Sequence, residues 1–149
     1  MHASQLLLAA SALALATAQT YKSSFTHYGS GDKYNSPNCN NGGACGLYVN
    51  GYSAAVSQNL YGVGGGQGAG PACGTCWYLV SGSHSVTVKV NNLCPAGNDN
   101  ALCSQSSLSA TNLEGANVHF DLCSDSGAAW AFFENGPGLL VGTATKVSC

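Results

Sequence analysis

Eight cysteines constrain this chain of 149 residues more than any other feature. All of them lie beyond the N-terminal segment, at Cys39, Cys45, Cys73, Cys76, Cys94, Cys103, Cys123 and Cys149. An even number of cysteines in a small chain from an oxidising compartment indicates a disulfide framework. We therefore expect four disulfides, in a pairing that the sequence leaves open.

The segment Cys73-Gly74-Thr75-Cys76 also has the spacing of half a zinc site. A structural zinc site needs four ligands, which come from a second cysteine pair or from suitably spaced histidines. The sequence contains no second CxxC, and its four histidines are not at ligand spacing. We expect neither a metal nor a cofactor.

The N-terminus indicates the compartment. Leu6–Ala16 consists of Leu and Ala with one Ser, which is shorter than the roughly 20 apolar residues that span a bilayer. Ala16-Thr17-Ala18 fits a small-residue cleavage site. We expect residues 1–18 to be a signal peptide and the protein to be secreted and extracellular. Residues 19–149 are then expected to form a single domain.

Charged residues are scarce, with four Lys and Arg against six Asp and Glu. A nucleic-acid-binding protein needs a basic stripe, and this chain has none. Binding to an anionic membrane surface is disfavoured for the same reason. Tyr, Asn, Ser, Thr and Gly are abundant, which favours a neutral and polar partner such as a carbohydrate. We expect a monomer.

Apolar alternation predicts short strands. Ser85–Asn91 places Val86, Val88 and Val90 on one face, and Asn117–Leu122 places Val118, Phe120 and Leu122 on one face. Two further candidate strands are Cys76–Val80 and Leu139–Ala144. Short strands with Gly-rich turns favour a small barrel or sandwich.

Helical signals are few. Ser53–Tyr61 is predicted to be a helix capped by Ser53, and Ser106–Ala110 is predicted to be a second short helix. The Gly-rich stretch Gly62–Gly70 lacks the GK[ST] ending of a phosphate-binding loop. We expect it to be a surface loop.

Asp121 is the first candidate for chemistry. It lies with His119 on the polar face of a strand whose other face is apolar. Partial burial against apolar walls raises the pKa of a carboxyl group, as a general acid requires. A structural carboxylate that binds turn amides is the alternative interpretation.

Six motifs in order resemble a known family. They are Phe25-Thr26-His27-Tyr28-Gly29, Gly43-Ala44-Cys45-Gly46, Tyr52-Ser53-Ala54-Ala55-Val56, Gly70-Pro71-Ala72-Cys73-Gly74-Thr75-Cys76, Val88-Lys89-Val90-Asn91-Asn92-Leu93-Cys94-Pro95 and His119-Phe120-Asp121-Leu122-Cys123. The set is similar to the compact, expansin-like branch of the glycoside hydrolase family 45 endoglucanases. The resemblance implies an all-β fold, a six-stranded double-psi β-barrel with short helices, long loops and an open groove. It also implies cleavage of internal β-1,4-glucosidic bonds with inversion.

The resemblance also implies roles for individual residues. Asp121 in the H-F-D motif is the expected general acid, with His119 beside it. Thr26 and Tyr28 match the T-x-Y element that lines the groove, and Asn112 matches an Asn near the acid. We expect these four residues to contact the substrate, a β-glucan such as cellulose or mixed-linkage glucan.

The catalytic base is less obvious. An inverting enzyme holds its second carboxylate about 6.5–9.5 Å from the acid. Larger members of the family carry an Asp two residues after the Tyr of T-x-Y, where this chain has Ser30, and its next Asp is Asp32. Compact members are thought to use an Asn after L-C-P, a place that Asn98 or Asp99 fills here according to how the loop is counted. Asp99 as base, or Asn98 as the residue that orients water, are both open, and Glu114 is an outside candidate.

Aromatic side chains offer platforms for sugar rings, and Tyr28 is the best candidate. Trp77 is expected in the core, and Trp130 is expected to pack against the barrel. Asp125 is expected to be a solvated turn residue.

Two further functions are compatible with the sequence. The barrel and the H-F-D motif also occur in expansin-like or loosenin-like modules, which bind glucan and loosen walls without hydrolysis. A secreted effector on the same barrel, without glucan activity, is a third interpretation.

Overall fold

The computed structural model describes residues 18–32 and 36–149, and the first 17 residues of the expected signal peptide lie outside this part of the chain. The strands are β1 (Thr20–Tyr28), β2 (Ser53–Ser57), β3 (Cys76–Ser81), β4 (His84–Cys94), β5 (Val118–Cys123) and β6 (Leu140–Val147). The helices are α1 (Gln58–Tyr61) and α2 (Ala128–Phe133), with 3-10 turns η1 (Gly43–Cys45) and η2 (Ala101–Cys103).

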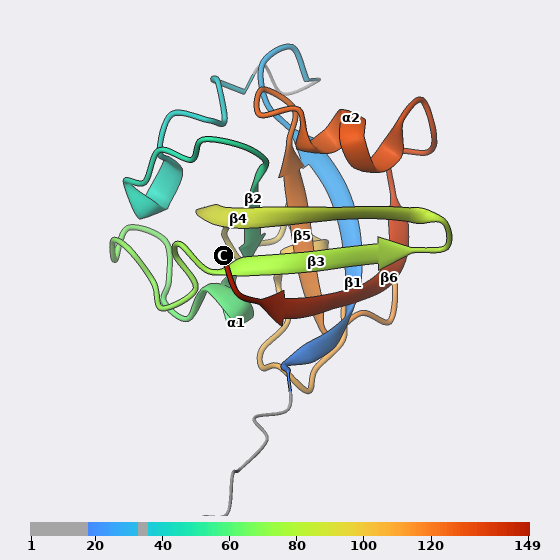
Figure 1. Ribbon diagram of the computed structural model, residues 1–149. Helices are drawn as coiled ribbons and strands as arrows, with labels where there is room; N and C mark the ends of the chain where they lie inside the picture. The colour runs from blue at the N-terminus through green and yellow to red at the C-terminus, as the bar shows by residue number, and fades with distance from the viewer. Residues whose placement is uncertain (1–17, 33–35) are drawn as a thin grey trace, which may run out of the picture.

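The six strands close into one barrel in the order β1-β5-β2-β4-β3-β6. The pairs β1/β5 and β2/β4 are parallel, and the other four pairs are antiparallel. Helix α2 lies across one end of the barrel (Figure 1). This architecture confirms the expected all-β double-psi barrel with short helices and long loops.

The barrel interior is built from the alternating strands that the sequence predicted. Val86, Val88 and Val90 of β4 are buried, and Val118, Phe120 and Leu122 of β5 are fully buried. Trp77 of β3 is 2% exposed and packs on Phe120 with a ring separation of 5.6 Å. Burial of these side chains supplies the main favourable term in folding.

The predicted helix over Ser53–Tyr61 is wrong in its first half. Residues Ser53–Ser57 form strand β2, and only Gln58–Tyr61 is helical. Strand β2 lies between β4 and β5, and all five of its residues are buried. Burial on both faces removes the alternation that marks a strand, so the small residues Ala54 and Ala55 misleadingly favour a helix.

The predicted helix over Ser106–Ala110 is also wrong, because this segment is a turn. The Ser107 hydroxyl accepts the Ala110 amide at 3.2 Å and is bonded to the Ser109 hydroxyl at 3.0 Å. Serine side chains that bind nearby backbone groups stabilise turns in competition with helix. The Gly62–Gly70 segment is an irregular loop, as expected.

All eight cysteines form disulfides: Cys39–Cys123, Cys45–Cys73, Cys76–Cys149 and Cys94–Cys103. The pairing fixes the chain at four places. Cys76 and Cys73 belong to different disulfides, so the CxxC spacing reflects two neighbouring bridges. The chain end lies at the start of β3 in Figure 1, where Cys149 joins Cys76. Within the described ranges, no helix is long and apolar enough to cross a membrane.

Candidate functional site

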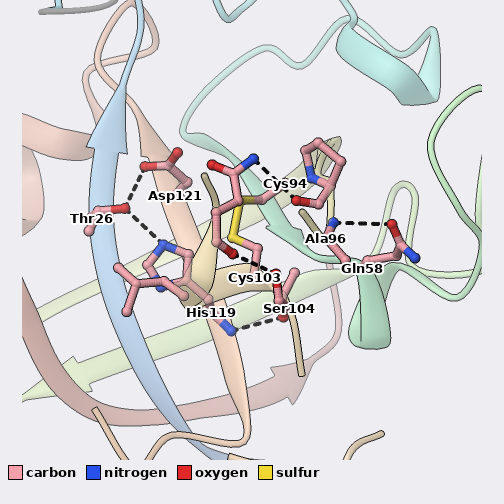
Figure 2. The surroundings of a disulfide bond; sticks show 12 residues. Thr26, Gln58, Cys94, Ala96, Cys103, Ser104, His119 and Asp121 are labelled. Atoms are coloured by element: carbon pink, nitrogen blue, oxygen red, sulfur yellow. Dashed lines mark hydrogen bonds between the residues drawn. A yellow bond between two sulfur atoms is a disulfide. The ribbon is translucent and has the colours of Figure 1, made fainter. Parts of the chain in front are cut away.

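A groove of about 880 Å³ runs past the ends of β1 and β5 and along the loop that follows β4. Its polar lining includes Thr26, Tyr28, Asp32, Asn92, Asp99 and Asp121. Three carboxylates therefore face one groove. Cys94 and Cys103 line the same groove, and Figure 2 shows their disulfide beside His119 and Asp121.

Asp121 is positioned by the parallel pairing of β1 with β5, which sets it opposite Thr26. The Thr26 hydroxyl donates a hydrogen bond of 2.7 Å to Oδ1 of Asp121. Burial raises the pKa of Asp121 to about 6, the Thr26 hydrogen bond opposes this rise, and the negative charge of Asp32 adds to it. A carboxyl group with this pKa is a competent proton donor in weakly acidic solution.

A chain of hydrogen bonds runs behind Asp121, and its direction is fixed. Thr26 donates to Asp121, so its oxygen accepts from His119 Nε2 at 2.8 Å, as the dashed lines of Figure 2 show. His119 Nδ1 then accepts from the Ser24 hydroxyl at 2.8 Å. Ser24 in turn accepts from the side-chain amide of Asn112 at 2.8 Å. The hydrogen bonds of this series therefore all run in one direction, from Asn112 to Asp121.

His119 is a buried member of the chain. Its side chain is 1% exposed, and burial lowers its pKa to about 4, so the ring is neutral above that pH. Both ring nitrogens are bonded within the protein, to Ser24 and Thr26. Neither ring nitrogen is left to bind a sugar hydroxyl.

Asn112 is anchored in the same way. Its Nδ2 donates to Ser24 and to the Leu102 carbonyl, and its Oδ1 accepts the amides of Glu114 and Ala116. These partners fix which amide atom faces Ser24. Asn112 lines a second hollow of about 390 Å³, outside the main groove.

The two candidates for the base are separated by the structure. Asp99 lines the main groove, whereas Asn98 lines the second hollow. Their loop is held by the Cys94–Cys103 disulfide and by Ser104, whose hydroxyl accepts the Gly97 amide at 3.0 Å. Glu114 lines neither cavity.

Asp32 is a groove residue that the sequence analysis noted without giving it a role. It lines the groove, its charge raises the pKa of Asp121, and its Oδ1 accepts the Ser36 amide at 2.9 Å. The available signal was its place four residues after Tyr28. The path of the intervening turn decides whether such a carboxylate reaches the groove, and the sequence does not give that path.

Asp125 is exposed, as expected for a turn residue, yet it also has structural contacts. Its Oδ2 accepts the amides of Ser30 and Cys39, each at 3.0 Å, and these hydrogen bonds lower its pKa. A Cβ at Gly29 (φ +135°) would lie 2.6 Å from that oxygen. Asp125 therefore ties the segment that precedes Asp32 to the end of β5.

The aromatic side chains are distributed differently from the expectation in one case. Trp130 is 64% exposed on α2, so the prediction that it packs against the barrel is wrong. On this short helix, Phe132 and Phe133 fill the inward positions. Tyr28 lines the groove, and its hydroxyl accepts a hydrogen bond from Asn92 at 3.1 Å.

Comparison with known proteins identifies the family. A sequence profile of the family described as EXPB1-like domain 1 matches residues 23–149. The chain belongs to the EXPB1-like domain 1 family. This confirms the expansin-type resemblance seen in the sequence. No curated protein matches this member of the family.

Solved structures share the fold of this EXPB1-like domain. A GH45 endoglucanase, EG27II, in complex with cellobiose superposes with a TM-score of 0.59 and 21% identity, covering 86% of this chain and 80% of that chain. The β-1,4-D-endoglucanase Cel45A from the blue mussel Mytilus edulis superposes with a TM-score of 0.61 and 24% identity, covering 86% of this chain and 79% of that chain. The expansin of Clavibacter michiganensis superposes with a TM-score of 0.52 and 21% identity, and the match covers 87% of this chain and 51% of the expansin chain.

Proposed function

We propose that this protein is a secreted endo-β-1,4-glucanase that hydrolyses internal glucosidic bonds with inversion. The observation that carries the proposal is Asp121, a carboxyl group with a raised pKa in a groove that also holds Asp32 and Asp99. An inverting glycosidase needs one protonated and one ionised carboxyl group on opposite sides of the scissile bond. Two of the solved structures with the same fold are endoglucanases, which supports the proposal.

Asp121 is the proposed general acid, which gives its proton to the leaving glycosidic oxygen. Thr26 holds Oδ1 as an acceptor, so the transferable proton resides on the other carboxyl oxygen, Oδ2. His119, Ser24 and Asn112 are positioning residues, because their hydrogen bonds keep Thr26 in its donor orientation. His119 and Asn112 are bonded within the protein and have no proposed sugar contact, whereas Thr26 and Tyr28 are proposed to contact the sugar.

Asp32 is the proposed base, because it lines the same groove as Asp121 and its charge raises the pKa of Asp121. It would remove a proton from the water that attacks the anomeric carbon. Asp99 is the alternative base from the sequence and faces the same groove. Asn98 lines the other hollow and is the weakest of the three candidates.

A second function, a non-hydrolytic module that binds and loosens glucan, is favoured by the family itself. The matching profile is expansin-like, and the Clavibacter michiganensis expansin has the same barrel. The two functions differ in one product, because hydrolysis creates reducing ends and loosening does not.

The test compares the wild type with Asp121→Asn on a soluble β-1,4-glucan. The wild type is expected to release reducing ends, and the variant is expected to lose at least a hundredfold in rate while it remains folded. Glu134→Gln, an exposed acid at the C-terminal end of α2 that lines neither cavity, is the control with the same change of charge. Undiminished hydrolysis by Asp121→Asn contradicts its role as acid. Binding to cellulose without new reducing ends in the wild type favours the module.

A further inference from the structure

The side-chain amide of Asn92 has a fixed orientation. Its Oδ1 accepts the backbone amides of Ala44 at 2.8 Å and Leu93 at 2.9 Å. A flipped amide would set its NH₂ group against two N–H donors, which is unfavourable. The turn η1 closes over this amide, since a Cβ at Gly43 (φ +48°) would lie 2.5 Å from Asn92 Cγ. Nδ2 of Asn92 is therefore the atom that faces Tyr28, and both residues line the groove.

The orientation of Asn92 decides whether the Tyr28 hydroxyl accepts or donates in the hydrogen bond between the two side chains. Asn92 Nδ2 donates to the Tyr28 hydroxyl oxygen at 3.1 Å, so this oxygen is an acceptor in the pair. A phenol has one proton, and that proton needs an acceptor of its own. In the part of the chain that the structure describes, no residue accepts it. Burial raises the pKa of Tyr28 to about 12, so the proton is present at every working pH.

Tyr28 lies close to the proposed reaction centre. It is two residues after Thr26 on β1, hence on the same face of the strand, and it lines the groove with Asp121. The charge of Asp121 contributes to the raised pKa of Tyr28. Tyr28, whose proton no described residue accepts, thus lines the same groove as the proposed acid.

We propose that the Tyr28 hydroxyl donates its proton in a hydrogen bond to an oxygen of the bound glucan. The residue at position 92 decides this direction, because Asn92 donates to the Tyr28 oxygen and leaves the phenol proton for the ligand. The inference rests on the proposed function only in taking a glucan as the ligand. The complementary group on the ligand is an acceptor: a hydroxyl, ring or glycosidic oxygen. With Asp at position 92, the freed carboxylate oxygen accepts the phenol proton, and Tyr28 presents only lone pairs to the groove.

The test is a double-mutant cycle on Asn92→Asp and Tyr28→Phe, made in the Asp121→Asn background so that cellohexaose, the probe in calorimetric titration, is bound without being cleaved. Asn92→Asp keeps the acceptor for Ala44 and Leu93, replaces the donor that faces Tyr28 by an acceptor, and adds a negative charge. Each single variant is expected to weaken binding about 3–10-fold, the size of one hydrogen bond. The double variant is expected to bind no more weakly than Tyr28→Phe alone. Asn41→Asp, an exposed site without contact to Tyr28, controls for the added charge.

Additive losses in the cycle, or wild-type affinity in Asn92→Asp, overturn the inference. A second measurement needs no ligand: the carboxyl group of Asn92→Asp, followed by NMR, should titrate below its usual range because three donors face it. Titration at or above that range also overturns the inference. If the wild type does not bind cellohexaose, the proposed glucan function fails, and this titration alone decides the polarity of the pair.

Discussion

Thr26 donates a hydrogen bond of 2.7 Å to Asp121 from the neighbouring parallel strand. The contact joins two of the six motifs that carried the family resemblance, those with T-x-Y and H-F-D. It stabilises the ionised form of Asp121 and so opposes the effect of burial on the pKa. The working pH of the acid therefore depends mainly on burial and in part on a residue of another strand.

Removal of the Thr26 hydroxyl should raise the pKa of Asp121 further. Thr26→Val keeps the shape of the side chain and loses the donor, so the alkaline limb of the pH–activity profile moves to higher pH. The variant also leaves His119 Nε2 without its acceptor, at a cost of about 1–3 kcal/mol in unfolding free energy. Thr26→Ser is the control, and its profile should match the wild type. An unchanged limb in Thr26→Val contradicts the assignment of the Thr26–Asp121 bond.

Asp32→Asn should act on Asp121 in the opposite direction. Loss of the negative charge lowers the pKa of Asp121, so the alkaline limb moves to lower pH. If Asp32 is the base, hydrolysis also falls by about 10²–10⁴-fold. Asp99→Asn is the matched variant on the loop between Cys94 and Cys103. A large loss of rate in Asp99→Asn together with normal activity in Asp32→Asn transfers the role of base to Asp99.

The stability of the protein should depend on pH through two buried groups of opposite sign. The folded pKa of Asp121 is raised from 3.8 to about 6, so its contribution to stability falls as pH rises between these values. The folded pKa of His119 is lowered from 6.5 to about 4, so its contribution rises with pH over nearly the same range. The two effects largely cancel in the wild type.

The variant Asp121→Asn removes the pH-dependent contribution of Asp121 to stability and leaves that of His119. Its unfolding free energy should fall by up to about 3 kcal/mol as pH drops from 6.5 to 4, the linkage of His119 alone. Above pH 6 the variant should be more stable than the wild type, because no buried charge remains at position 121. Urea unfolding at several pH values measures both effects. A flat pH dependence in the variant argues against a buried neutral His119.

Two disulfides should differ in their effect on stability and on the site. Cys39–Cys123 closes a loop of sequence separation 84, and Cys94–Cys103 closes one of 9. On the chain-entropy relation, removal costs about 4–5 and 2–3 kcal/mol respectively. Replacement of each pair by Ser, followed by chemical unfolding, measures the difference. The Cys94–Cys103 variant should also lose glucan affinity, because its loop forms one wall of the groove. Equal stability losses contradict the entropic account.

Much of the barrel follows from local pattern. Val86, Val88 and Val90 alternate with polar residues, and so do Val118 and Phe120, because each strand has one face in the core. Strand β2 could not be predicted in this way, because both of its faces are buried and its sequence does not alternate. The exposure of Trp130 could not be predicted either, because which side chains of a short apolar helix are buried depends on how the helix is oriented.

The site shows the same division between local and distant information. Asp121 was predicted because a strand fixes its direction relative to the core. Asp32 was not, because the turn after Tyr28 sets its position, and Asp125 holds that turn from β5 through Ser30 and Cys39. The hydrogen bonds that lead from Asn112 to Asp121 join residues 88 to 95 positions apart in the sequence, so only folding brings them together. Their direction depends on contacts of Asn112 that no local pattern shows.

The most direct test of the central claim is the anomeric form of the first products released from cellohexaose, followed by proton NMR. Single-displacement hydrolysis with Asp121 as acid predicts that the wild type forms the α-anomer first and that Asp121→Asn forms no product at a comparable rate. Initial release of the β-anomer would contradict inversion. The absence of any cleavage by the folded wild type, with cellohexaose bound, would contradict hydrolysis altogether.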